Sequence, residues 1–131
     1  MSQQDVDVGH QFVDAVNRSD VETALRLVHP EVVFESLRAA TEGAFIGRDG
    51  LTRFLDDTAE TFELFQVQHS DVRDLGDRVL AIGTIRIRGR GSGIETEVPT
   101  ASIAEFRDGM IWRYKDYGDP RAALEAAGLP E

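Results

Sequence analysis

The sequence predicts an α+β fold in which helices come first and an antiparallel sheet follows. Apolar residues recur at helical spacing over most of residues 8–62, whereas residues 65–117 alternate at strand spacing between short glycine-containing turns. The chain has 131 residues, 41% of them apolar and 29% charged, which suits one packed core. No repeat or linker divides the sequence, so we expect a single domain over residues 1–131.

Two amphipathic helices are predicted at the N-terminal end. The first ends near Arg18 and has one apolar stripe: Val8, Phe12, Ala15 and Val16. Ser19 and Glu22 match the S-x-x-E capping box, which predicts the start of a second helix. Its apolar face consists of Val21, Ala24, Leu25 and Val28. Pro30 ends this helix, because proline disfavours the helical conformation of the residue before it.

A short strand and a third helix follow. Residues 31–36, EVVFES, alternate as a strand, and a loop with Gly43 and Gly47 comes next. The third helix presents one apolar face: Leu51, Phe54, Leu55, Thr58, Ala59 and Phe62. These three N-terminal helices are expected to pack on the sheet formed by the second half of the chain.

Four strands are predicted at 65–74, 78–90, 94–107 and 110–117, separated by LGD, GSG and RDG. They form a mainly antiparallel sheet. A short C-terminal helix follows, with Asp119 as its N-cap and Pro120 at its first position.

The first hairpin turn fixes which residues share a face. Gly91 and Ser92 suit a two-residue loop with glycine first. This register places Arg88 opposite Glu95, and two residues further Arg86 opposite Glu97. The charged pairs therefore mark one face of the sheet, and the other face is apolar.

The second hairpin turn leaves two alternatives. A two-residue loop at Asp108-Gly109 would bury Arg113 and Lys115 on the apolar face. A three-residue bulged loop over 107–109 places aromatic residues and one acid there instead: Phe106, Trp112, Tyr114 and Asp116. We prefer the bulged loop, because burying two cations costs more than burying aromatic rings. Asp116 then points inward, near Thr100.

Charge and composition exclude several classes of function. With 14 basic and 24 acidic residues, the formal net charge is −10, which disfavours nucleic acid and anionic membrane as partners. There is no cysteine, and His10, His29 and His69 share no ligand spacing, so we expect no metal and no cofactor. The polar N-terminus lacks the apolar segment of a signal peptide, which predicts a cytoplasmic protein.

Four segments resemble a known family in their order and spacing: HPEVVFES, GAFIGRDGLTRFL, LGDRVLAIGTIRIRG and IAEFRDGMIWRYKDYGDP. The chain resembles the SnoaL-like members of the nuclear-transport-factor-2-like, ketosteroid-isomerase-like superfamily. The resemblance implies a cone-shaped α+β barrel, in which a strongly curved sheet wraps over the helices and encloses an apolar pocket. It also implies a homodimer through the outer face of the sheet.

The ketosteroid isomerases of this superfamily use a carboxylate base and two oxyanion donors, a tyrosine and an aspartate that stays protonated. The base aligns with Ser36, and the two donors align with Phe12 and Ser102. The three functional groups are absent here, so the resemblance does not extend to steroid isomerisation by that route.

The C-terminal end is similar to limonene-epoxide-hydrolase-like proteins, whose last strand carries W-R-D-Y-F-D where this chain has YKDYGD. Their catalytic aspartate matches Asp116, but its arginine and second aspartate align with Gly83 and Ile85. Their water-binding tyrosine and asparagine align with Phe34 and Ser36. SnoaL-type cyclases need a single aspartate, which aligns here with either Asp116 or Asp119.

We therefore expect a protein that binds a hydrophobic small molecule in an apolar pocket. As an enzyme it would be a cofactor-free cyclase, isomerase or hydrolase with Asp116 as its general acid–base; the alternative is a non-catalytic ligand-binding domain or a dimeric association domain. The residues expected to bind substrate are Phe12, Phe34, Ser36, Phe54, Ile85, Ser102, Trp112 and Tyr114. An apolar patch on the outer sheet face, formed by Leu80, Ile82 and Ile103, predicts the homodimer contact.

Overall fold

Six strands form one strongly curved sheet in the order β2-β1-β6-β5-β4-β3. The computed structural model describes residues 2–130. The elements are α1 (Ser2–Asn17), α2 (Val21–Arg26), β1 (Val28–Glu35), α3 (Ala39–Glu42), β2 (Phe45–Ile46), α4 (Gly47–Thr61), β3 (Phe62–Asp74), β4 (Arg78–Gly89), β5 (Glu95–Arg107), β6 (Met110–Asp116) and α5 (Pro120–Ala126). β1 and β6 run parallel, and the other neighbouring strands run antiparallel.

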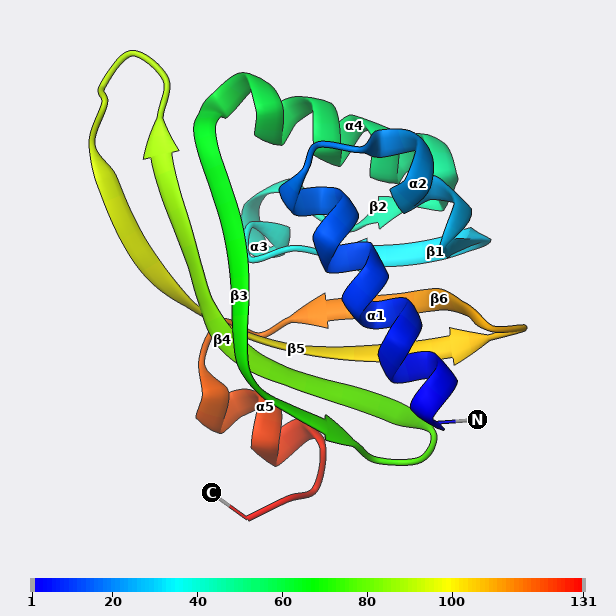
Figure 1. Cartoon of the computed structure of the whole chain (residues 1–131). Helices are drawn as coiled ribbons and strands as arrows, with labels where there is room; N and C mark the ends of the chain where they lie inside the picture. Colours follow the sequence, from blue (N-terminus) through cyan, green and yellow to red (C-terminus); the bar gives the residue numbers. More distant parts are fainter. Residues whose placement is uncertain (1, 131) are drawn as a thin grey trace.

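The sheet curves around α1, while α2 and α4 close one end and α5 lies on the other side of the sheet (Figure 1). The main core fills the concave side, where residues of α1, α4 and β1 such as Ala15, Leu51 and Val32 are fully buried. This is the predicted α+β cone, and the predicted fold class is confirmed. None of the helices in residues 2–130 is long and apolar enough to cross a bilayer.

The second helix is shorter than predicted. α2 ends at Arg26, and Val28 begins β1 instead of completing the helical face. Asp20 caps the helix, with its side chain accepting from the Thr23 amide, whereas Ser19 takes a left-handed conformation with φ 58°. The predicted capping box is therefore wrong: the cap lies one residue later, and a left-handed Ser19 cannot form it.

Between β1 and the third predicted helix, the chain forms two short elements that were expected to be loop. α3 is a single turn, and β2 pairs antiparallel with β1 through Val33 and Ile46. Neither is long enough for its sequence period to be recognised. The third predicted helix is α4, and Phe62 begins β3 instead of ending that helix.

The first hairpin has the predicted register but a longer loop. Arg88 lies opposite Glu95, and Arg86 lies opposite Glu97. The Gly89 amide pairs with the Ile94 carbonyl, which leaves four residues between them instead of two. The register survives because the loop lengthens by one residue on each strand.

The second hairpin forms by the alternative that was not preferred. Arg107 pairs with Met110 around a two-residue Asp108-Gly109 loop, whose φ angles of 55° and 75° are those that a type I′ turn requires. Trp112 then forms a bulge, because Phe106 pairs with Ile111 whereas Glu105 pairs with Arg113. The faces of Tyr114 and Asp116 are therefore as predicted, although the extra residue lies in the strand and not in the turn.

The outer apolar patch is covered by the chain itself. α5 packs on this face, and its Ala123 and Leu124 cluster with Leu80 and Ile103. Leu80 is fully buried and Ile103 is 7% exposed, while Ile82 is half-buried at the edge of the cluster. The reasoning that assigned this patch to a partner subunit is therefore wrong, because an internal helix occupies it; the homodimer itself stays a prediction.

A close backbone approach bends the sheet beside the cavity described below. β3 is bulged between His69 and Asp71, and Gly83 of β4 lies opposite His69. A Cβ atom at Gly83 would lie 2.0 Å from the Gln68 carbonyl oxygen, so no larger residue fits without moving the backbone. Glycine at this position permits the curvature that encloses the concave face.

Candidate ligand-binding site

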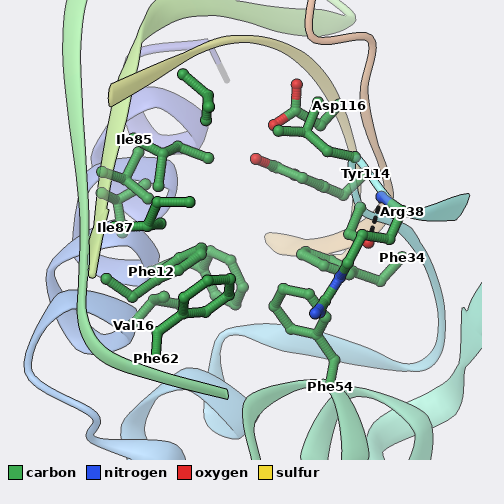
Figure 2. Close-up of a pocket in the computed structure, with 16 residues that line it drawn as sticks. Phe12, Val16, Phe34, Arg38, Phe54, Phe62, Ile85, Ile87, Tyr114 and Asp116 are labelled. Carbon is green, nitrogen blue, oxygen red and sulfur yellow. Dashed lines mark hydrogen bonds between the residues drawn. The ribbon is translucent and has the colours of Figure 1, made fainter. Parts of the chain in front are cut away.

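A cavity of about 260 Å³ lies between α1 and the concave face of the sheet. It is a slot with two walls: Phe34, Phe54 and Tyr114 lie on one side, and Ile85 and Ile87 on the other (Figure 2). Its full lining is Phe12, Val13, Val16, Phe34, Ser36, Leu37, Arg38, Phe54, Phe62, Phe65, Val67, Ile85, Ile87, Val98, Tyr114 and Asp116.

The first wall is a continuous stack of rings. The ring centroid of Phe34 in β1 lies 4.6 Å from that of Tyr114 in β6, at an interplanar angle of 7°. It lies 4.7 Å from the ring centroid of Phe54 in α4. Phe12 of α1 tilts against both Phe34 and Tyr114 at 6.3 and 6.4 Å. Parallel pairing of β1 with β6 places Phe34 directly beside Tyr114, so the wall depends on this sheet order.

The second wall is mainly aliphatic. β4 and β5 contribute Ile85, Ile87 and Val98, whose side chains point into the concavity because inner residues alternate along each strand. β3 continues the surface with Phe65 and Val67. A slot of this composition accommodates a flat apolar molecule between aromatic and aliphatic surfaces.

Asp116 supplies a negative charge at one end of the slot, and it is 8% exposed. One carboxylate oxygen accepts from the Ala101 amide at 3.1 Å and the Gly118 amide at 2.9 Å. The other oxygen accepts from the Thr100 hydroxyl at 2.5 Å. A carboxylate offers about four acceptor positions, so these three bonds leave one for a ligand.

Tyr114 carries a neutral hydroxyl beside Asp116. Burial raises the pKa of Tyr114 above its usual range, the Asp116 charge raises it further, and a hydrogen bond with Ser102 opposes both. The phenol therefore stays protonated at any physiological pH and can donate a hydrogen bond.

A second, smaller cavity of about 30 Å³ lies behind Tyr114, between α1 and the sheet. His69 and Ser102 line it, and the His69 Nε2 atom is buried without a hydrogen-bond partner among residues 2–130. Burial lowers the pKa of His69, the nearby His10 lowers it further, and Asp116 opposes the shift. The lowered pKa favours the neutral form of the His69 imidazole.

Ser36 and Arg38 follow β1 at the other polar part of the slot. The Arg38 amide donates to the Ser36 hydroxyl oxygen at 3.2 Å (Figure 2). The Arg38 guanidinium lies over the Phe54 ring, with its Cζ 5.5 Å from the ring centroid. Its Nε also lies 3.4 Å from a Glu42 carboxylate oxygen.

Seven predicted site residues line the slot: Phe12, Phe34, Ser36, Phe54, Ile85, Tyr114 and Asp116. Ser102 does not, because Tyr114 separates it from the slot. Trp112 does not either, and its inward placement is corrected. The β6 bulge places its ring between the guanidinium groups of Arg107 and Arg113, at 3.8 and 4.3 Å.

Sequence reasoning missed a large part of the lining. Phe65 and Val67 could have been found, because they alternate with polar residues in a predicted strand. Arg38 could not, because it lies beyond the end of β1 in a segment without a period. Within residues 2–130, no group of three or more histidine, aspartate or glutamate side chains could hold a metal ion.

With the fold and the slot described, comparison with protein families identifies the family of this chain. The SnoaL-like domain model matches residues 10–114 of the chain. The protein therefore belongs to the SnoaL-like domain family, as the resemblance predicted. No curated protein sequence matches the chain.

Solved structures share the fold at low sequence identity. An NTF2-like protein of unknown function from Burkholderia pseudomallei superposes with a TM-score of 0.79 at 17% identity, over 95% of this chain and 97% of the other. TerC, crystallised with polyporic acid, gives 0.79 at 21% identity, over 93% and 96%. A proposed SnoaL-like polyketide cyclase from Shewanella denitrificans gives 0.76 at 19% identity, over 95% and 96%.

Proposed function

We propose that this protein binds a flat, hydrophobic small molecule in the slot between Phe34 and Ile85. The supporting observation is the pair of facing walls, aromatic on one side and aliphatic on the other, around a cavity of about 260 Å³. A core that served only stability would close such a space, because each unfilled volume costs free energy.

The end of the slot beside Asp116 provides orientation. The remaining acceptor position of Asp116 suits a ligand hydroxyl, and the Tyr114 hydroxyl can donate to a ligand carbonyl or hydroxyl. TerC, which shares the fold, has been crystallised with polyporic acid, and a small-molecule role for this chain is in keeping with that.

A second candidate function is acid–base catalysis on the bound molecule, with Asp116 as the reacting group. The observation that favours it is the position of this carboxylate in the slot lining next to Tyr114. The proposed cyclase from Shewanella denitrificans shares the fold. Against this role stand the three hydrogen bonds that already hold Asp116, so we rank ligand binding first.

A blocking variant tests the binding proposal. Ile87 lines the slot and is half-buried, so Ile87→Trp should fill the slot while the fold is kept. Ile94 is 70% exposed outside the slot lining, and Ile94→Trp is the matched control. Titration with the neutral fluorophore Nile red should show binding to the wild type and to the control, and at least tenfold weaker binding to Ile87→Trp. Equal binding by all three proteins would overturn the proposal.

A further inference from the structure

We propose that the ligand of the slot is an acid, and that its anionic group binds the Arg38 guanidinium. This inference rests on the proposed binding function and adds the chemical class of the ligand. Among the sixteen residues that line the slot, Arg38 carries the positive charge and Asp116 the negative charge. The electrostatic potential therefore changes sign along the slot, from positive near Arg38 to negative near Asp116.

Exposure distinguishes the two charges. The Arg38 side chain is 31% exposed, whereas Asp116 is 8% exposed. Arg38 thus lies toward solvent, where an ionised group keeps part of its hydration. A carboxylate placed at Asp116 would meet a like charge in a buried setting, which costs far more. The pattern orients an acidic ligand with its anion at Arg38 and its neutral end at Asp116.

The guanidinium is held in a suitable position. Its Cζ lies 5.5 Å from the Phe54 ring centroid, and Phe54 is itself part of the aromatic wall. The ring face attracts a cation at this distance. The Nε contact with Glu42 at 3.4 Å adds a second restraint. Arginine presents five donors in a planar fork, and this geometry suits the two oxygens of a carboxylate.

The ligand's apolar part would continue along Phe54, Phe34 and Tyr114. A cavity of about 150 Å³ holds benzene, so a volume of about 260 Å³ accommodates about two fused rings. The net charge of −10 would repel acids from most of the surface. A cation in the slot lining would therefore direct an acidic ligand to the slot. The geometry thus favours a flat bicyclic aromatic carboxylate.

A matched pair of ligands tests this inference: 2-naphthoate and its neutral amide, 2-naphthamide. Both have the same rings, and their dissociation constants can be measured by displacement of Nile red at pH 7.5. The wild type should bind naphthoate about tenfold more tightly than naphthamide. Arg38→Gln should weaken the binding of naphthoate more than that of naphthamide, and so remove this preference. Higher salt should weaken the binding of naphthoate alone.

Arg53 provides the control variant. Its guanidinium lies 5.8 Å from the Phe45 ring, a contact of the same kind, but Arg53 does not line the slot. Arg53→Gln should keep the full preference for naphthoate. If the wild type binds both ligands equally, or if Arg38→Gln keeps the preference, the acid inference is wrong and the binding proposal stands. If neither ligand nor Nile red binds the wild type, the binding proposal itself fails.

Discussion

The Asp116 carboxylate accepts a hydrogen bond from the Thr100 hydroxyl at 2.5 Å, between the end of β6 and the middle of β5. The same carboxylate accepts from the amides of Ala101 and Gly118. Asp116 therefore fastens the end of β6 to β5 and to the turn before α5, while it also lines the slot. Its structural role and its proposed role toward a ligand can be separated by substitution.

Asp116→Ala should lower the free energy of unfolding by about 2–4 kcal/mol, because it leaves a buried amide, a half-buried amide and a buried hydroxyl without this acceptor. Asp116→Asn should cost clearly less. An asparagine oxygen can still accept from both amides, and its NH₂ group can donate to Thr100. Urea denaturation monitored by circular dichroism measures both values. Equal, small losses for the two variants would show that these hydrogen bonds do not stabilise the fold.

Asp116→Asn also decides between binding and catalysis. Because the amide keeps the shape and most hydrogen bonds of the site, ligand affinity should change by less than about tenfold. An enzyme that uses Asp116 as its acid–base group should lose turnover by a factor of about 10²–10⁴. Full turnover in a folded Asp116→Asn protein would exclude this residue as the catalytic group.

Gly83→Ala should destabilise the protein by about 2–4 kcal/mol, because the added methyl group meets the Gln68 carbonyl in a bent part of the sheet. Gly9→Ala, in α1, is the control, since a Cβ there meets no atom within 4 Å. The control should be neutral or slightly stabilising, because alanine favours helix. Thermal unfolding of the two variants compares them directly. A Gly83→Ala protein as stable as the wild type would show that the sheet can relax at this bend.

His69 should make stability fall in mild acid. Its pKa in the folded state lies below the ordinary value of 6.5, mainly because of burial, so below that pH the unfolded chain binds the proton more readily. The unfolding free energy should therefore be unaffected by His69 above pH 7 and decrease as the pH falls through about 6.5, until the folded-state pKa is passed. His69→Gln should flatten this part of the stability–pH curve. Parallel stability–pH curves for the wild type and His69→Gln would contradict the lowered pKa of His69.

Ile103→Glu should unfold the protein and not merely separate subunits, because Ile103 lies beneath α5 with Leu80 and Leu124. Burying a carboxylate there should cost more than about 3 kcal/mol. Gln68→Glu, at an exposed position of β3, is the control and should leave stability unchanged. Circular dichroism measures folding, and analytical ultracentrifugation measures the oligomeric state. A folded Ile103→Glu monomer replacing a wild-type dimer would restore the predicted interface.

Much of the architecture could be predicted from the sequence, because the long elements have clear periods. The stripe of α1, the alternation of β3 to β6 and the Asp119 cap of α5 all appear at the expected places. The boundaries at Val28 and Phe62 were wrong, since the helical and strand periods both accommodate a single apolar residue at a junction.

The candidate site was less predictable. Because burying cations costs more free energy than burying aromatic rings, Tyr114 and Asp116 could be placed on the inner face. This comparison could not distinguish a bulged turn from a tight turn followed by a bulge at Trp112. Nor could it show that α5 would cover Leu80, because amphipathicity does not identify the surface that a short helix meets. Arg38 could not be predicted as a site residue, because it lies outside every segment with a helical or strand period.

Locating a bound ligand in the slot would test the binding proposal most directly. Isoleucine and valine methyl groups can be labelled with ¹³C and followed by NMR as 2-naphthamide is added. We expect shifts for the methyl groups of Ile85, Ile87 and Val98, with no change at Ile46 or Ile94, which are exposed outside the slot. Saturating shifts confined to the slot would establish it as a binding site. Unchanged resonances of the slot methyl groups, or shifts only at Ile46 and Ile94, would contradict the binding proposal.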